Sequence, residues 1–358
     1  MSATTMPEVY HRLHRFGPEY GGDEESNHGL TNHGPMAAEV MVRRGLEIDV
    51  DRWLDRYVRR LTELPTAEVS IRPEQWRTAL GDAARLPGWT AYFQRELRER
   101  PWSTVLVEWW PRLLPGIVAG STHGVIRVGH AVRTLRAGVD GCPPATETLH
   151  ELAHGLAFWA ARYRELAGVV APAGRRSAAE ALPGVARLQD QSGFIAHRLD
   201  RLERSPEWAP SLRALRPSAT AEEVPTALDS LVDAGVAAYL GLGHGAPVLL
   251  VHAATAPNAV RHVLPTLPPD QWALSLTAAW TAAAAVVATY APARPAPVAD
   301  VVRAGRHLSR EDALQRAAEH GDEHVLKFAD TAVEAYDRTG DPDLLAATLH
   351  VGSLVSQA

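Results

Sequence analysis

Asp49-Val-Asp-Arg-Trp53-Leu-Asp-Arg-Tyr57-Val-Arg-Arg-Leu61 is the stretch that best shows the fold class. Its apolar residues fall on one stripe of a helix, with charged residues opposite; they are Val50, Trp53, Leu54, Tyr57, Val58 and Leu61. Alternating period-two runs are scarce, and Val248-Leu-Leu-Val251, which could be a short strand, lies inside a helical pattern. We therefore predict an all-α protein.

The helical pattern recurs along the chain. It predicts helices over 88–99, 103–118, 145–167, 223–240, 246–264, 268–290, 309–318, 322–338 and 343–355, and a further helix opened by Pro35. Proline-rich breaks lie at 170–176 and 291–298, and the second could detach residues 300–358 as a small helical unit. We predict an N-terminal segment, residues 1–30, and one large helical domain, residues 31–358. In that domain, residues 300–358 pack back on the core.

The composition is that of a soluble globular protein, with 46% hydrophobic and 22% charged residues among 358 and a formal net charge of −6. No basic run is interleaved with aromatic residues, which argues against a nucleic-acid partner. Cys142 is the only cysteine, so neither an intrachain disulfide nor a cysteine zinc site is expected. The tract from Leu274 to Ala291 is too weakly apolar for a membrane span. With no signal-peptide pattern at the N-terminus, we expect a cytoplasmic protein without a membrane partner.

Lys327 is the only lysine among 36 basic residues. Arginine replaces lysine as a surface charge but not where an amine must lose its proton. The alternative to a chemical role is that nucleotide bias produced the arginine-rich composition and one lysine remained by chance. A buried lysine amine can become neutral near pH 7 and act as a base or a Schiff-base nucleophile. It can also add carbon dioxide to form a carbamate, which is a carboxylate on a long arm.

Several histidines stand in segments that suggest a role. His33 precedes a Gly-Pro helix start, His252 ends an apolar run, and His324 shares a helix face with Lys327 at spacing i,i+3. A capping role for His33 and a core role for His252 are the alternatives. A carboxylate among several imidazoles is a ligand set that suits non-haem iron.

His123 and His130 lie seven residues apart, on one face of a predicted helix and about 10.5 Å apart along its axis. Both can bind one ion only if it lies beside the helix between them. One ligand and one substrate contact is equally consistent. Gly124 and Gly129 are costly inside a helix and predict the close approach of another helix or of a ligand.

Four segments in this order resemble the questin oxidase-like family: Asn32-His33-Gly-Pro-Met-Ala-Ala-Glu, His123-Gly-Val-Ile-Arg-Val-Gly-His130-Ala-Val-Arg, His252-Ala-Ala-Thr-Ala-Pro-Asn-Ala-Val-Arg and Gly321-Asp-Glu-His324-Val-Leu-Lys327. The resemblance runs from about residue 16 to the C-terminus. The chain departs from the family pattern in two places. The stretch His28-Gly-Leu-Thr adds a histidine, and Ala253-Ala-Thr255 stands where the family usually has more β-branched residues.

The resemblance implies a mononuclear non-haem iron centre with four histidines and a carboxylated lysine, set between inward-facing helices. Carried onto this chain, the metal ligands are His123, His130, His252, His324 and Lys327. His33 could displace His123 or His130, and otherwise would orient the substrate or a ligand in a catalytic role.

The implied activity is that of an Fe(II)- and dioxygen-dependent oxygenase. It would cleave or oxidise an anthraquinone-like aromatic polyketide ring in natural-product biosynthesis, with carbon dioxide held as the lysine carbamate. Arg127 is expected to pair with an anionic substrate oxygen, and an ordinary ion pair is the alternative. Tryptophans 109, 110, 159 and 280 could line an aromatic pocket, with core packing as the default.

Three other activities stay open. The first is an NADPH-linked Baeyer–Villiger-type oxygenase, although no Gly-x-Gly-x-x-Gly follows a strand, so the reductant would act through a partner. The others are a zinc hydrolase or decarboxylase on the same ligands and a non-catalytic helical binding protein. We interpret the remaining histidines as structural or surface residues: His11, His14, His150, His154, His197, His244, His262, His307, His320 and His350. His150 and His154 could bind a metal at their i,i+4 spacing, but they lack the glutamate of the zinc-protease motif.

Overall fold

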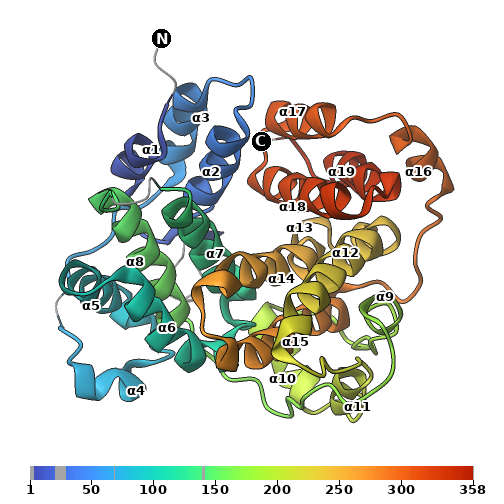
Figure 1. Ribbon diagram of the computed structural model, residues 1–358, viewed down its shortest axis with the longest axis horizontal. Coiled ribbons are helices and arrows are strands. Elements are labelled where there is room, and N and C mark those ends of the chain that lie inside the picture. Colours follow the sequence, from blue (N-terminus) through green and yellow to red (C-terminus); the bar gives the residue numbers. More distant parts are fainter. Residues whose placement is uncertain (1–3, 21–29, 68, 139–141, 358) are drawn as a thin grey trace. The chain divides into compact units, whose positions relative to one another are not determined.

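The computed structural model describes residues 4–20, 30–67, 69–138 and 142–357, and within them the regular structure is almost entirely helical (Figure 1). The exception is a two-residue antiparallel pair, β1 (Glu19–Tyr20) with β2 (Leu30–Thr31). The all-α prediction is confirmed. His28 lies outside the described residues, and the domain boundary at residue 30 stays a prediction.

The chain divides into two compact units, Met1–Arg164 (unit 1) and Glu165–Ala358 (unit 2). Within unit 1, α8 packs against α1, α5 and α7, while α2 packs against α1, α3 and α7. The helices of unit 1 are α1 (Met6–Leu13), α2 (Gly34–Arg44), α3 (Val50–Tyr57), α4 (Trp76–Ala79), α5 (Leu86–Glu99), α6 (Trp102–Leu113), α7 (His123–Arg136) and α8 (Thr146–Ala161). Short 3-10 turns occupy Val58–Arg60, Pro73–Gln75, Ala83–Arg85, Leu114–Gly116 and Ala119–Thr122.

Local signals explain where these helices begin and end. The side chain of Asp49 caps α3 by accepting a 2.9 Å hydrogen bond from the backbone N–H of Arg52. The predicted stripe of α3 is buried at Val50, Trp53, Leu54 and Tyr57. The helix ends sooner than its periodicity predicted, because the chain tightens into a 3-10 turn at Val58–Arg60.

The tryptophans fill cores rather than line a pocket. Trp109 packs edge-on against Trp89, Tyr92 and Phe93 at centroid distances of 5.5, 5.5 and 4.8 Å. Trp110 and Trp159 pack edge-on at 5.4 Å. Each arrangement is the one that aromatic quadrupoles favour in a packed interior. The aromatic-pocket expectation is therefore corrected to the core-packing alternative.

Within unit 2, α14 packs against α12, α15 and α18, and α19 packs against α12, α16, α17 and α18. Residues 300–358 thus lie against helices that precede the proline-rich break. The helices of unit 2 are α9 (Ala178–Ala181), α10 (Ile195–Glu203), α11 (Trp208–Arg213), α12 (Val224–Leu242), α13 (Pro247–Leu250), α14 (His252–Val263), α15 (Trp272–Tyr290), α16 (Ala299–Gly305), α17 (Arg310–His320), α18 (Glu323–Thr339) and α19 (Pro342–Leu354). Its 3-10 turns are Ala221–Glu223, Gly243–Gly245, Leu264–Thr266 and Pro269–Gln271.

The most apolar stretch is a core helix. In the described residues, Pro269–Tyr290 is long and apolar enough to cross a membrane by length and composition, but 72% of its apolar window is buried. The indole of Trp280 on this helix donates a 2.9 Å hydrogen bond to the carbonyl of Leu212. The helix is consistent with the core of a soluble protein.

Gly124 allows α7 and α8 to approach closely, as its position in a helix predicted. A Cβ at this residue would lie 2.6 Å from Cβ and 2.9 Å from Cα of Trp159. The two helices must separate to accommodate any side chain there, because backbone and buried indole have little freedom to shift.

We expect Gly124→Ala to lower the free energy of unfolding by about 1–3 kcal/mol through this overpacking, measured as a drop in the midpoint of thermal or urea unfolding. Gly352→Ala is the matched control in a helix, because its new Cβ would meet only Cδ2 of His320 at 3.8 Å. The control should be neutral or stabilising, since alanine favours helix over glycine. Equal effects of the two substitutions would show that close packing at Gly124 is unimportant.

Candidate metal centre

His33 and His123 form a pair in unit 1. His33 is the N-cap residue of α2, and its backbone N–H donates a 2.7 Å hydrogen bond to the hydroxyl of Tyr57. His123 opens α7 directly after a left-handed turn, in which Ser121 and Thr122 have φ of 52° and 65°. Positive φ is uncommon for residues other than glycine and is strained for the β-branched Thr122. This turn fixes the direction from which the His123 ring enters the pair.

The two rings meet through their Nε2 atoms, 2.8 Å apart. His123 Nδ1 lies 2.7 Å from the carbonyl of Gly120, so Nδ1 carries the proton and donates, leaving a lone pair on Nε2. Two nitrogen ligands at right angles, each about 2.1 Å from an ion, are about 3 Å apart. The pair therefore fits two neighbouring ligands of one metal ion, or a single shared proton.

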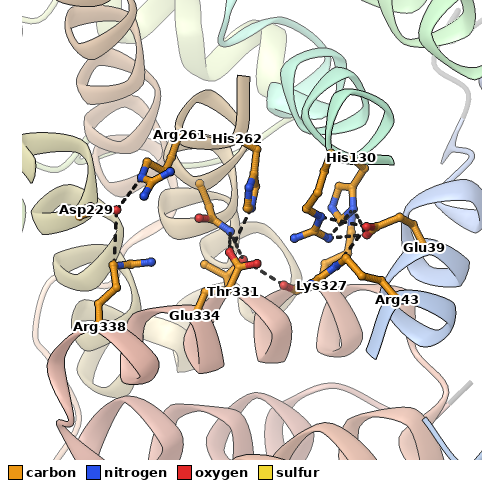
Figure 2. A network of polar contacts seen from close by, with 12 residues as sticks. Glu39, Arg43, His130, Asp229, Arg261, His262, Lys327, Thr331, Glu334 and Arg338 are labelled. Atoms are coloured by element: carbon orange, nitrogen blue, oxygen red, sulfur yellow. Dashed lines mark hydrogen bonds and ion pairs between the residues drawn. The ribbon is translucent and has the colours of Figure 1, made fainter. Parts of the chain in front are cut away.

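His130 has a different partner, although it lies on the same helix as His123. Its Nδ1 is 2.9 Å from a carboxylate oxygen of Glu39 on α2 (Figure 2). The same buried carboxylate accepts hydrogen bonds from Arg133, at 2.9 Å from Nε, and pairs with Arg43 at 3.1 Å. Burial raises the pKa of Glu39, but Arg133 and His130 outweigh it and hold that pKa at about 2. Glu39 was not predicted as a site residue, because its position in α2 does not reveal the His130 and Arg133 side chains that it meets on α7.

In unit 2, the start of α18 positions His324. The side chain of the N-cap residue Asp322 accepts hydrogen bonds from the backbone N–H groups of His324, at 2.8 Å, and Val325, at 3.2 Å. The ring of His324 lies nearly parallel to that of His252, with centroids 6.1 Å apart and an interplanar angle of 20°. Burial lowers the pKa of His324, against the pull of Asp322. This favours the neutral imidazole that binds metals.

Lys327 follows one turn later and is only 2% exposed. Its Nζ has no hydrogen-bond partner among the residues that the structure describes. Burial lowers the pKa of Lys327 to about 7, although Glu323 and Asp322 act in the opposite direction. A large share of this amine is therefore neutral and nucleophilic at physiological pH.

The helices that carry these residues, α14 and α18, run parallel with a defined register. Asn258 donates to Thr331 at 3.4 Å and to Glu334 at 2.9 Å, and Glu334 also pairs with Nε2 of His262 at 3.0 Å (Figure 2). From the stacked imidazoles to these contacts, the residue numbers rise in the same direction along both helices, so the two helices are parallel.

Thr255 takes the position on α14 that Lys327 takes on α18, because each lies three residues after the stacked histidine of its helix. Spacing of three residues keeps each side chain on the face of its histidine, about 4.5 Å further along the axis. The Thr255 hydroxyl is buried and, like the Lys327 amine, has no hydrogen-bond partner in the described part of the chain. Buried polar groups are nearly always satisfied in native structures, so each of these two groups calls for a bonding partner. Thr255 was not predicted from the sequence, although its i,i+3 spacing from His252 was an available signal.

Arg127 does not behave as a free substrate contact. It is fully buried in unit 1, where Nε and Nη2 donate to the two oxygens of Glu151 at 2.6 and 2.7 Å. A paired fork of this kind already compensates the guanidinium charge. The structure shows the ion pair that was the alternative for Arg127. Its Nη1 is buried without a hydrogen-bond partner among the described residues, and a substrate contact through Arg127 stays a prediction.

Glu39→Gln tests the Glu39 cluster through its pH dependence. The folded-state pKa of about 2 lies below the ordinary 4.5, so the carboxylate stabilises the fold fully above about pH 4.5 and loses this contribution as pH falls toward 2. We expect the variant to be less stable by about 3 kcal/mol at pH 7, with the difference shrinking in urea titrations from pH 5 to pH 3. Glu74→Gln removes an exposed pair with Arg72 and should change stability by less than about 0.5 kcal/mol. A difference that does not depend on pH would refute the assigned charge.

Buried histidines able to act as metal ligands thus occur in both units, at His33 and His123 and at His324. A sequence model of the questin oxidase-like family matches residues 53–332, which is 280 of the 358 residues. The match includes all five positions predicted as metal ligands, and His33 precedes it. No curated protein matches the chain. The protein therefore belongs to the questin oxidase-like family, which implies an oxidoreductase.

Proposed function

We propose that this protein is a non-haem iron-dependent oxygenase that cleaves or oxidises the ring of an anthraquinone-like aromatic polyketide in natural-product biosynthesis. Family membership supports a polyketide-related oxidation. The observation that carries the iron proposal is the buried Lys327 amine, which lies on the same helix face as His324 and has no hydrogen-bond partner in the described part of the chain.

The proposed ligands are His33, His123, His252, His324 and the carbamate of Lys327. His33 replaces His130 in this set because Nε2 of His33 lies 2.8 Å from Nε2 of His123, the spacing of two neighbouring ligands of one ion. His130 lies two helical turns from His123 on α7. Imidazoles with one carboxylate are a ligand mix that suits Fe(II). The residues present therefore fit the metal that the family implies.

The carbamate supplies the carboxylate of this set. The Nζ lone pair of Lys327 attacks the carbon of dissolved carbon dioxide, an N–C bond forms, and one N–H proton passes to water. The product carries one negative charge where the free amine was neutral. The Thr255 hydroxyl, which shares the level of Lys327, donates a hydrogen bond to a carbamate oxygen and holds its orientation. Arginine cannot undergo this reaction because its guanidinium stays protonated.

Fe(II) would supply the one-electron chemistry that dioxygen needs to react with a closed-shell ring. The chain contributes the surroundings of that reaction. Gly120 fixes the tautomer of His123, and Asp322 fixes the first turn that carries His324. If both oxygen atoms enter the substrate, no reductant is consumed. A Baeyer–Villiger-type insertion of one atom would require two electrons and two protons, from NADPH through a partner.

We also propose that the enzyme works in the cytoplasm on a small-molecule substrate. The burial of the apolar helix Pro269–Tyr290 supports a soluble protein.

Metal analysis after anaerobic loading tests the ligand set. We expect close to one iron per chain in the wild type and little in Lys327→Arg, because arginine keeps the positive charge and forms no carbamate. His33→Gln should also lose iron, while His130→Gln should retain it despite a loss of stability. Substrate-dependent dioxygen uptake with an anthraquinone should follow the iron content.

Equal iron in the wild type and in Lys327→Arg would eliminate the carbamate as a ligand. Loss of iron in His130→Gln with retention in His33→Gln would reverse the choice between these two histidines.

Thr255→Val tests the hydrogen bond to the carbamate. The carbamate can be trapped by ethylation with a trialkyloxonium salt at several carbon dioxide concentrations and located at Lys327 by peptide mass spectrometry. A hydrogen bond to a charged group contributes about 1.5–3 kcal/mol, so the variant should need at least about tenfold more carbon dioxide for half modification. Thr255→Ser should behave as the wild type. Thr281→Val, which removes a hydroxyl bonded to its own helix at 2.9 Å, is the control. An unchanged carbon dioxide requirement in Thr255→Val would remove Thr255 from the site.

A further inference from the structure

A row of histidines outside the proposed iron ligands lies where α1 meets α8 in unit 1. The ring of His11 is 5.3 Å from that of His14, and the ring of His14 is 6.4 Å from that of His150. His150 and His154 are four residues apart on α8, so they share one face of that helix. The row runs from the exposed His11 to the buried His154.

His154 is the member of the row that most needs a partner. It is 2% exposed, and neither Nδ1 nor Nε2 has a hydrogen-bond partner among the described residues. Buried polar atoms are nearly always satisfied in native structures, by protein, water or an ion. Burial, Arg127, His150 and His14 together lower the pKa of His154 far below its usual value, so its imidazole is neutral. A neutral imidazole offers a lone pair to a cation.

His14 is also prepared for binding. Its Nδ1 contacts the backbone carbonyl of His11, and a carbonyl can only accept, so Nδ1 carries the proton. The lone pair is then on Nε2. Histidines that bind metals almost always donate their other ring N–H in this way. Burial and His14 lower the pKa of His150, which is half-buried, and this again favours the neutral ligand form.

The ring spacings from His11 to His150 are those of imidazoles that can share an ion after the exposed rings rotate. With metal–nitrogen distances of about 2.0–2.1 Å, two imidazoles on one ion have ring centroids about 5–6.5 Å apart. Both measured distances lie in this range, and the exposed ring of His11 can turn a nitrogen toward the ring of His14. A carboxylate oxygen of Glu147 lies 3.8 Å from Nδ1 of His11 and offsets Arg98, whose charge acts on His150. Pairs of histidines at i,i+4 are a recurring zinc-binding arrangement.

We propose that His14, His150 and His154 bind one transition-metal dication of borderline softness, Zn²⁺ in particular, and that His11 completes the site from its exposed end. The ion would join α1 to α8 and so reinforce the packing of Val9, Tyr10 and Leu13, the buried side chains of α1. This site needs neither Lys327 nor any of the proposed iron ligands.

Equilibrium dialysis of the iron-containing protein against Zn²⁺, followed by metal analysis, measures zinc and iron in each chain. We expect the wild type to bind one more zinc than the double variant His14→Gln/His150→Gln, with a Kd on the order of 1 μM and the iron content unchanged. His154→Gln should weaken zinc binding at least tenfold. The control His197→Gln/His307→Gln, at two exposed histidines of unit 2, should bind zinc as the wild type does. Zinc should raise the thermal midpoint of the wild type but not of the His14/His150 double variant.

Four results would overturn the site. Equal zinc uptake by the wild type and the His14/His150 double variant would show that these histidines do not bind it. Zinc gained in exchange for iron would place the ion at the iron ligands. Unchanged affinity in His154→Gln, or an equal loss in the His197/His307 control, would reduce the effect to adventitious binding by surface imidazoles.

Discussion

The removal of the Lys327 amine from water is the constraint on which the proposed chemistry depends. An ammonium group buried without a partner is costly. Among the described residues no carboxylate lies at hydrogen-bond distance from Nζ, and burial lowers the pKa of Lys327 to about 7. A neutral amine can react with carbon dioxide and a guanidinium cannot. Under the proposed chemistry, this difference would account for one lysine in a chain whose other basic residues are all arginine.

The surrounding structure holds the other candidate ligands by ordinary backbone chemistry. A left-handed turn and the carbonyl of Gly120 orient His123, and the cap by Asp322 orients His324. The hydrogen bonds of Asn258 set the register of α14 against α18, which brings Thr255 to the level of Lys327. Each of these interactions is worth little alone. Together they fix rings and hydroxyls before a metal arrives, which lowers the entropy lost on binding.

How much the sequence predicts depends on whether a feature is local. Helical periodicity identifies the fold class, and spacing i,i+3 places His324 beside Lys327. Periodicity shows the face on which His130 lies but not the neighbour it meets, so only the structure reveals Glu39, 91 residues earlier, as its partner. The partner of Arg127 could not be predicted from periodicity either, because Glu151, which pairs with it, lies on another helix. The row from His11 to His154 arises only when α1 docks on α8.

In the proposed chemistry, Lys327 becomes a carbamate and binds iron. The most direct measurement is the electron density around Lys327 in crystals grown anaerobically with Fe(II) and bicarbonate. We expect a carbamate on Nζ with one oxygen about 2.0–2.2 Å from an iron ion that also binds imidazole nitrogens, including those of His252 and His324. An unmodified amine beside an iron ion held by histidines alone would contradict it.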